Sequence, residues 1–467
     1  MNKEILIFFI LLLTALSSFA QEEEPEFVDS SFGKKVIKTV YNYNKGERLP
    51  DRLEDYEGLK RLTIYHIRDN EFPAVFSELK NLKSLMISSE HLERIPEQIG
   101  GLTSLESLSI KVDVLRSIPK SIGELKNLKS LRINDLESGL ERLPDEIGEL
   151  SSLEKLYIRS ESLSELPDVF SQLDSLKSVE LNKMRITDLP ASFYQLKNLE
   201  ELELVFCRSF AVLSDDISKL SELRILSINE SVLKKLPEGI SALENLEVLT
   251  VTPSYISLDV LIEWSKLQNL ESIYFKSVIN PEALLDSICS ARLPKLKSIG
   301  LTIRTPFPIK ENLNNLIALE RISFRNSIPI IEGDLLNLNK LHLFDIRNGF
   351  EHFSTIKKIA NLETIVFAKS TYSDEDLSHY IKDLAEMPRL KSIHIGNNKL
   401  KEFPSQLLTL ENLTDLNVIN NEITSIPKDC QFKKGFRKIT FGGVQKKNIG
   451  VDALNELKKR NPHIIIR

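Results

Sequence analysis

The sequence has few cysteines and no excess of charge of one sign. Cys207, Cys289 and Cys430 are the only cysteines in 467 residues, and their odd number and wide spacing exclude a disulfide-stapled framework. The formal net charge of −6 argues against a nucleic-acid or polybasic membrane-surface protein. Glycine and proline, at 17 and 19 residues, are too few for a collagen-like or low-complexity chain. The composition therefore predicts a folded protein with a packed core.

Sequence motifs of catalysis and of metal or phosphate binding are also missing. The seven histidines show neither H-E-x-x-H nor a paired metal-ligand spacing, and no glycine-rich phosphate loop is present. Each cysteine occupies a position typical of a small buried hydrophobe, and nothing in the sequence places a base beside it. We therefore expect a protein that is not an enzyme and needs no cofactor or metal. A hydrolase built on the same scaffold is the least favoured alternative.

The longest apolar run lies at the start of the chain. Residues 1–20 combine a basic residue, an apolar stretch over 5–13 and small residues at Ser18 and Ala20, which predicts a secretory signal peptide cleaved before Gln21. The alternative is a buried or membrane-spanning helix, but the run is too short to span a bilayer comfortably and the acidic segment QEEEPE follows it directly. No cysteine stands at the cleavage point, and no later run is long enough to cross a bilayer. We expect a secreted or periplasmic protein without an integral membrane segment.

A repeat, mostly of 23 or 24 residues, runs through most of the chain. Its mark is a burst of the form L-x-x-L-x-I, as in Leu82, Leu85 and Ile87. Seventeen such bursts start between residues 59 and 436, one of them placed at Leu338. One unit of this length cannot bury its own apolar face and must stack on its neighbours. The period therefore predicts a solenoid.

Each repeat predicts one coil with three parts. The alternation within the burst is the period of a short strand with one buried face, and stacked bursts form a parallel sheet. A pair such as Ile95-Pro96 follows, and its proline requires an extended or turn-like return segment. Two apolar residues three apart, such as Ile99 and Leu102, then suit a single 3-10 turn on the outer side.

The pattern LP-x-x-I-G-x-L-x-x-L-x-x-L-x-I resembles the leucine-rich repeat family, especially its Ras-suppressor-like and plant Ras-group-like repeats. The resemblance covers about residues 49–441. It implies an α/β right-handed solenoid with a concave parallel sheet, a convex side of 3-10 turns or short helices, and a role in binding other proteins. The asparagine of that family's ninth position is clear only at Asn398 and Asn421, and Cys207 is among its replacements. Elsewhere, either the backbone groups find other partners or the coils bend differently. The leader and the Lys, Ile and Asn bias resemble exported bacterial proteins.

The repeat pattern predicts how the chain is divided. We expect a signal peptide at 1–20, an acidic N-terminus and cap at 21–58, the solenoid at 59–441 and a C-terminal cap at 442–467. Between 252 and 389 the Leu-Pro signature is missing and the spacing varies, which indicates either sequence drift or an altered curvature that shapes a binding surface. Helices are expected there at "PEALLDSI" after Asn280 and at "SDEDLSHYIKDLAEM" from Ser373.

The outward positions of the strands predict where a partner binds, because interfaces favour aromatic and arginine side chains on a preformed surface. Two candidate patches follow from the count: Arg132, Tyr157 and Arg159 in the first, and Tyr274, Lys276, Arg325, His342 and Phe344 in the second. The leading hypothesis is an exported recognition module for a protein partner. The alternative is a cell-surface or envelope glycan-binding protein whose aromatic side chains stack on sugars. For any single residue, an ordinary polar strand surface is the competing interpretation, and the oligomeric state is not indicated.

Overall fold

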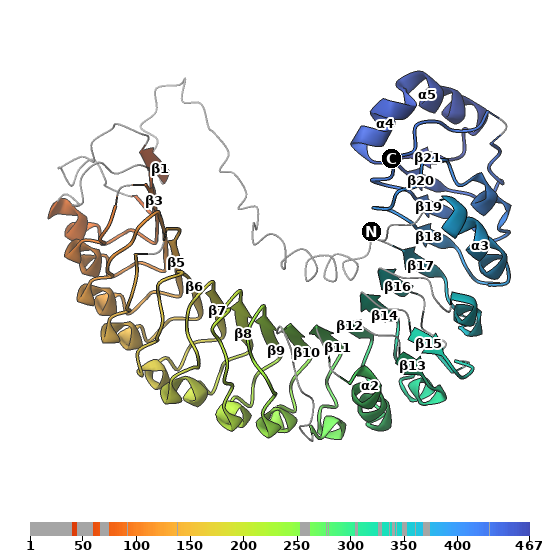
Figure 1. The fold of residues 1–467 in the computed structure, drawn as a ribbon. Coiled ribbons are helices and arrows are strands. Elements are labelled where there is room, and N and C mark those ends of the chain that lie inside the picture. The colour runs from red at the N-terminus through yellow and green to blue at the C-terminus, as the bar shows by residue number, and fades with distance from the viewer. Residues whose placement is uncertain are drawn as a thin grey trace. The chain divides into compact units, whose positions relative to one another are not determined.

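Each repeat folds into one coil, in which a short strand leads through an extended segment to a short outer helix (Figure 1). The chain forms two compact units, Met1–Leu233 and Lys234–Arg467, called unit 1 and unit 2 below. The predicted signal peptide lies outside the residues that the structure describes. The computed structural model describes residues 40–43, 59–65, 74–90, 92–137, 139–252, 262–276, 278, 280–303, 307–325, 329–335, 337–338, 341, 343–347, 353–359, 361–367, 374–428 and 430–467.

Unit 1 contains a parallel sheet whose strands follow one another in chain order, with 3-10 helices on the side opposite the sheet (Figure 1). Its strands are β1 (Val40–Tyr43), β2 (Arg61–Tyr65), β3 (Ser84–Ser89), β4 (Ser107–Val112), β5 (Ser130–Asp135), β6 (Lys155–Arg159), β7 (Ser178–Asn182), β8 (Glu201–Val205) and β9 (Ile225–Asn229). Its 3-10 helices are η2 (Ala74–Glu78), η3 (Glu97–Gly101), η4 (Lys120–Glu124), η5 (Asp145–Glu149), η6 (Phe170–Gln172), η7 (Ala191–Gln195) and η8 (Asp215–Lys219).

Unit 2 continues the same plan with more varied coils. Its parallel sheet comprises β10 (Val248–Thr252), β11 (Ser272–Lys276), β12 (Ser298–Thr302), β14 (Arg321–Arg325), β16 (Leu343–Arg347), β17 (Thr364–Phe367), β18 (Ser392–His394), β19 (Asp415–Asn417), β20 (Lys438–Thr440) and β21 (Ile465–Ile466). A separate parallel pair consists of β13 (Phe307–Ile309) and β15 (Pro329–Ile331). The helices are η9 (Glu238–Ala242), η10 (Trp264–Lys266), α2 (Pro281–Ser290), η11 (Glu311–Asn315), η12 (Phe353–Lys358), α3 (Asp374–Ala385), η13 (Ser405–Thr409), α4 (Gly443–Ile449) and α5 (Val451–Arg460).

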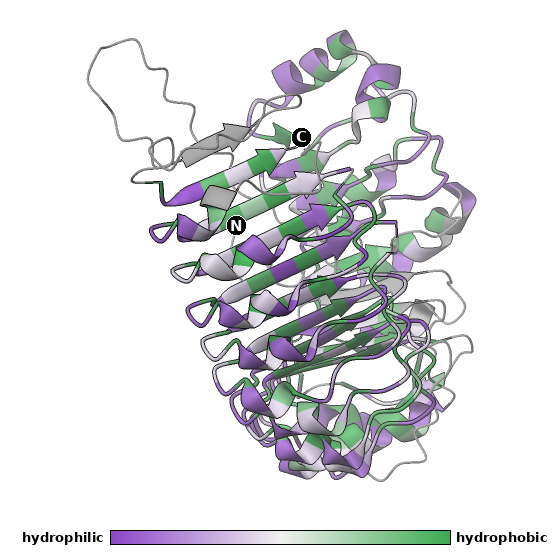
Figure 2. Cartoon of the chain, turned by 90° about the vertical axis from the view of Figure 1, so that its left-hand side faces the viewer, coloured by the Kyte–Doolittle hydropathy of each residue, from purple (hydrophilic) through white to green (hydrophobic). Residues whose placement is uncertain are grey.

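The alternation of apolar and polar residues decides which face of each strand is buried. Figure 2 shows hydrophobic and hydrophilic residues alternating along the strands of unit 1. Leu85, Leu108 and Leu131 are neighbours in register on β3, β4 and β5, and each is at most 1% exposed. Full burial of a leucine side chain stabilises a fold by about 2 kcal/mol. Such columns, repeated in every coil, hold the stack together.

Proline marks the point where the return segment ends and the outer helix begins. Pro96 has φ −65° and ψ 151°, an extended conformation, directly before η3. Ile99 and Leu102 then turn into the core, where both are fully buried, and the Leu102 amide donates to the Ile99 carbonyl at 3.1 Å. The 3-10 turn that the spacing of three predicts is therefore confirmed.

The ninth-position asparagines bond backbone carbonyl groups between coils. The Asn421 side-chain amide donates to the Ile395 carbonyl of the preceding coil at 2.9 Å. Asn398 donates in the same way to the Phe367 carbonyl, also at 2.9 Å. Where the asparagine is missing, another side chain can act: the Cys207 thiol lies 3.3 Å from the Leu181 carbonyl oxygen and can donate to it. This cysteine is therefore a buried structural residue, as its repeat position predicts.

Asp135, at the eighth position of its repeat, also connects coils, but it accepts hydrogen bonds where the asparagines donate them. Its buried carboxylate accepts hydrogen bonds from the Leu115 amide at 3.0 Å and from the Gly139 and Leu140 amides at 2.8 Å. The Ser160 hydroxyl of the next coil donates to the same carboxylate at 2.8 Å. One side chain thus ties together three consecutive coils of unit 1.

The two helices expected in the irregular stretch are present. Helix α2 begins after Asn280, whose side chain accepts from the Ala283 amide at 3.1 Å, and Pro281 occupies its first turn. Helix α3 begins at Asp374, while the expected cap Ser373 lies outside the described residues. These longer outer helices explain the longer spacings, because an α-helix needs more residues than a 3-10 turn.

One repeat start placed by the sequence is wrong. The count puts a burst at Leu338, but the register aligns Phe344 with Ile322 and Ile365, the buried fourth positions of the neighbouring repeats. The repeat therefore starts at Leu341, and Leu338 belongs to the preceding outer turn, where its carbonyl accepts from the Leu341 amide. The corrected spacing from the preceding burst is close to that of the regular repeats.

Candidate interaction surface

The centre of the sheet face in unit 1 has four chemically distinct side chains side by side. Arg132, Tyr157, Glu180 and Glu203 are register neighbours on β5, β6, β7 and β8, and we call them the sheet-face row. Each points away from the core, because the residues before and after it in its strand are buried. Adjacent strands lie about 4.8 Å apart, which places each side chain within reach of the next.

Arg132 and Tyr157 form the aromatic end of the row. The guanidinium carbon of Arg132 lies 4.1 Å from the Tyr157 ring centroid, a cation–π geometry. Tyr157 is only 8% exposed, while Arg132 remains exposed. Arg159, the third member of the first predicted patch, lies two residues further along β6 and is half-buried. The structure thus places all three on neighbouring strands and brings two of them into contact.

Glu180 and Glu203 form the acidic end. Burial raises the pKa of Glu180, and this is partly offset by the Asn182 side-chain amide, which donates to Glu180 Oε1 at 3.3 Å, and by Arg132. Burial raises the pKa of Glu203 to about 7, with further increases from the charges of Glu180 and Glu201. Close to neutral pH, both the protonated and the ionised form of this carboxyl are therefore populated.

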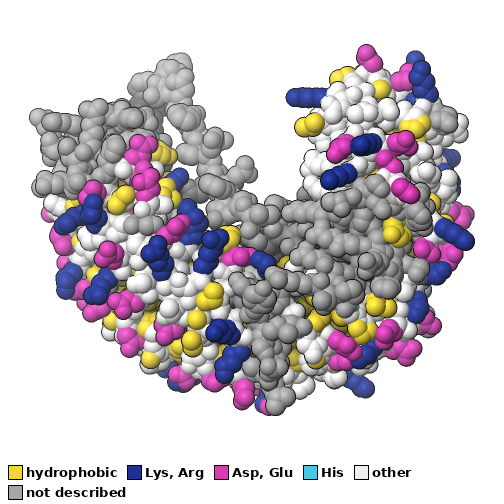
Figure 3. All heavy atoms as spheres, viewed as in Figure 1, with side chains coloured by type: hydrophobic (Ala, Val, Ile, Leu, Met, Phe, Trp, Pro, Cys, Tyr) yellow, Lys and Arg dark blue, Asp and Glu magenta, His cyan; other side chains and the backbone are white. Residues whose placement is uncertain are grey.

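Sequence reasoning did not select these two glutamates. Glutamate is common on soluble surfaces, so a single fifth-position glutamate indicates nothing. The usable signal is the column: in three consecutive repeats the fifth position holds Tyr157, Glu180 and Glu203. Two carboxylates in adjacent coils beside an aromatic ring differ from the mixed charges elsewhere on unit 1, where Figure 3 shows Lys and Arg interspersed with Asp and Glu.

Elsewhere on unit 1, a carboxylate can pair with lysines of the neighbouring coils. Glu106 accepts from Lys83 at 2.9 Å and from Lys129 at 3.1 Å, so one carboxylate is shared by cations of the two flanking coils. Among the described residues, by comparison, no lysine, arginine or histidine forms an ion pair with Glu180 or Glu203. Within the described part of the chain, the acidic end of the sheet-face row therefore has no ion-pair partner, and only the charge of Arg132 partly offsets it.

The second predicted patch lies in unit 2, where Tyr274 contacts the neighbouring strand. The Tyr274 hydroxyl is 2.9 Å from Thr302 Oγ1, and the ring crosses the backbone of β12 at Gly300, where an added Cβ would lie 2.3 Å from Tyr274 Cδ2. The register aligns Lys276 and Arg325 on either side of Thr302 in one row. The backbone register thus brings the predicted residues Tyr274, Lys276 and Arg325 together.

The other two members of the second patch are His342 and Phe344. His342 lies outside the described residues. Phe344 was expected to face outward, but the register aligns it with the buried positions Ile322 and Ile365, and Asp345 takes the fifth position beside Ser323. The cause is the misplaced repeat start, which the variable spacing of this stretch concealed.

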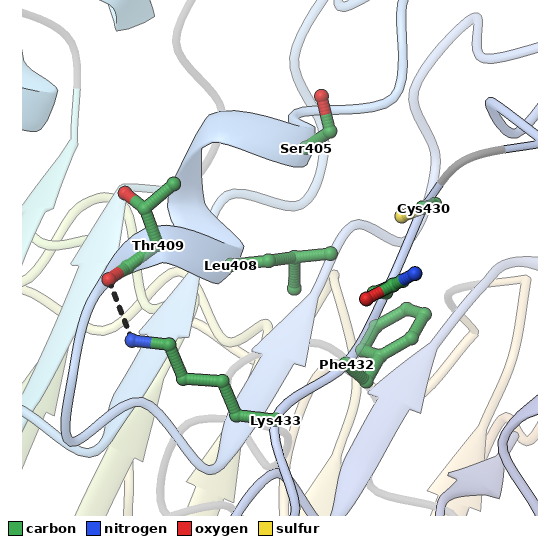
Figure 4. A pocket seen from close by; sticks show the side chains of 7 residues that line it. Ser405, Leu408, Thr409, Cys430, Phe432 and Lys433 are labelled. Carbon is green, nitrogen blue, oxygen red and sulfur yellow. Dashed lines mark hydrogen bonds between the residues drawn. The ribbon is translucent and has the colours of Figure 1, made fainter.

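A hollow on the outer side of unit 2 was not predicted (Figure 4). Its volume is about 590 Å³, and it lies between η13 and the segment before β20. Leu408, Cys430 and Phe432 form a largely buried floor, and Lys433 donates to the Thr409 carbonyl at its rim at 2.8 Å. Within the described part of the chain, no group of three or more His, Cys, Asp or Glu side chains is placed to bind a metal.

Comparison with known proteins agrees with this architecture. Residues 120–327 match a family model described as a leucine-rich repeat region. The structure is similar to a leucine-rich repeat protein of Leptospira interrogans, at 22% identity and a TM-score of 0.55, over 90% of this chain and 92% of that one. It is also similar to TLR13 in its complex with ssRNA13, at 18% identity and a TM-score of 0.56, over 87% of this chain and 64% of that one.

These two likenesses concern the fold. No helix of the described residues combines the length and the apolar character needed to span a membrane. The parallel strands alternating with 3-10 turns and the stacked leucine columns give this chain the fold of a leucine-rich repeat solenoid, in agreement with the family model matched by residues 120–327.

Proposed function

We propose that the chain is an exported, non-enzymatic recognition protein that binds a protein partner through the sheet face of unit 1. The observation that supports this most directly is the sheet-face row, in which an exposed arginine, a clamped tyrosine and two carboxylates occupy adjacent strands. Arginine and tyrosine are enriched where protein interfaces bind most strongly. A surface made of paired strands is already ordered, so little conformational entropy is lost on binding.

The size of the surface suits a protein partner. From β2 to β9 there are seven interstrand spacings. At about 4.8 Å each, and with strands of roughly 17 Å, they span an area of roughly 550 Å² before side-chain relief is added. A standard interface buries about 800 Å² on each partner, so unit 1 alone supplies most of one.

The glycan alternative receives less support. Sugar stacking needs an open aromatic face, but Tyr157 is covered by Arg132 and the Tyr274 ring lies against the β12 backbone. Nucleic acid is disfavoured as well, because Glu180 and Glu203 would repel phosphate. The ssRNA13 of the TLR13 complex is a ligand of that protein.

The test uses residues 21–467 as affinity bait on native extract, with partners identified by mass spectrometry and then purified. The variants are Arg132→Ala and Tyr157→Ala, and the matched control is Arg142→Ala, which removes an arginine exposed outside the strands. Binding of a purified partner should fall at least tenfold in both variants and remain unchanged in the control. Equal binding by all four proteins would reject the sheet face of unit 1 as the site.

A further inference from the structure

Three carboxylates lie on one face of two neighbouring strands in unit 1. Glu180 on β7 and Glu203 on β8 are direct register partners, and both side chains are half-buried. Glu201 projects from the same face of β8, two residues earlier, and accepts from the Ser178 hydroxyl at 3.0 Å. The Glu180–Glu203 pair is thus an acidic site inside a larger, partly apolar sheet face.

The nearby cations are engaged elsewhere. Arg132 lies over the Tyr157 ring at 4.1 Å, and Lys183, which follows β7, pairs with Glu161 at 2.9 Å. The fold therefore removes much of the solvent from two adjacent carboxylates, while the described residues supply no ion pair to either and only the charge of Arg132 partly offsets that of Glu180. Such a desolvated pair is unfavourable until a cation arrives, which gives an incoming cation more to gain here than at an ordinary surface glutamate.

A metal ion is a poor match for this pair. Calcium requires six to eight oxygen ligands at about 2.3–2.6 Å, and the described residues contain no group of side chains placed for a metal. A lysine or arginine side chain fits better, because its apolar stem can lie along the edge of Tyr157 while its charged end reaches the two carboxylates. Arginine could bind both carboxylates at once through its planar fork of donors.

Arg132 adds the opposite charge at a known separation. It lies two strands from Glu180 and three from Glu203, so about 12 Å separates it from the middle of the acidic pair. An extended segment that crosses the strands spans this distance in about three to four residues, at about 3.3 Å each. Residues an even number of positions apart face the same side of an extended segment, so a partner that suits both charges would have an acidic and a basic residue about four positions apart.

From this arrangement we propose that the partner presents a lysine or arginine side chain that docks between Glu180 and Glu203, with an acidic residue of the same segment against Arg132. This inference rests on the proposed function, since it names the chemistry of the partner at that same surface. It defines a cationic anchor within an extended protein segment.

The test uses a phage-displayed library of random 12-residue peptides selected on residues 21–467, with the enriched peptides resynthesised. Enriched peptides should contain a lysine or arginine whose replacement by methionine weakens binding about tenfold or more. Glu203→Gln and Glu180→Gln should weaken binding to a similar extent. The matched control Glu149→Gln, a glutamate of η5 that pairs with Lys126, should not alter it. A reciprocal pair, Glu203→Lys with the peptide lysine changed to glutamate, should restore binding.

The outcomes separate the two proposals. If Arg132→Ala and Tyr157→Ala abolish peptide binding but Glu180→Gln and Glu203→Gln do not, the cationic anchor is refuted and the sheet face remains the site. If the enriched peptides have no basic residue in common, the anchor is refuted as well. If no peptide depends on any residue of the sheet-face row, the proposed function fails together with the anchor.

Discussion

Replacing Glu203 by glutamine should stabilise the protein most at alkaline pH. Burial raises the pKa of Glu203 to about 7 from its ordinary 4.5. The folded state therefore binds this proton more tightly than the unfolded chain does. The stabilising effect of the raised pKa is fully present below about pH 4.5 and is lost as the pH rises through about 7. At about 1.4 kcal/mol per pKa unit, the shift corresponds to about 3 kcal/mol of unfolding free energy.

Glutamine keeps the size and polarity of the side chain but cannot ionise. The unfolding free energy of Glu203→Gln should exceed that of the parent chain by about 3 kcal/mol near pH 8, and by less than about 1 kcal/mol near pH 5.

The measurement is urea unfolding followed by far-ultraviolet circular dichroism from about pH 5 to about pH 8. Glu149→Gln is the matched control, because its exposed pair with Lys126 at 2.8 Å should contribute less than about 1 kcal/mol at any of these pH values. A difference between Glu203→Gln and the parent that does not change with pH would refute the reasoning, since it would mean that the Glu203 carboxyl is as well solvated in the fold as in the unfolded chain.

Three further outcomes follow from the buried contacts. Asp135→Ala should lower the unfolding free energy by about 3–5 kcal/mol, because several buried donors lose their acceptor, and a loss below about 1 kcal/mol in urea unfolding would contradict this. Gly300→Ala should cost about 1–3 kcal/mol or displace the Tyr274 ring, seen as a changed tyrosine signal in near-ultraviolet circular dichroism, whereas an unchanged spectrum and stability would refute the close approach. Burial raises the pKa of Cys207 to about 11 and that of Cys289 to about 12. Both thiols should therefore resist a disulfide reagent near pH 8 until urea unfolds the chain. Rapid labelling of the native protein would disprove their burial.

Part of the candidate site could be predicted because the register of a regular repeat is a matter of counting. Tyr157 lies one repeat after Arg132 at the same position, so their contact across neighbouring strands follows from the period. The count failed at Phe344, because the register places the start of the burst three residues later than the count does. In that stretch several leucines fit the pattern, and only the hydrogen-bonded register separates Leu341 from Leu338.

The coil itself was determined by the sequence alone, because each repeat contains its own strand alternation, its proline and its paired apolar residues, and these local features act in the same way in every coil. The tertiary structure alone decided the raised pKa of Glu203 and, among the described residues, the absence of an ion pair with it. Those properties depend on how much solvent the neighbouring coils remove and on which cations they engage, and the side chains concerned lie one or more whole repeats away along the chain. The sequence alone does not show whether a carboxylate is paired with cations of neighbouring coils or remains open to a partner.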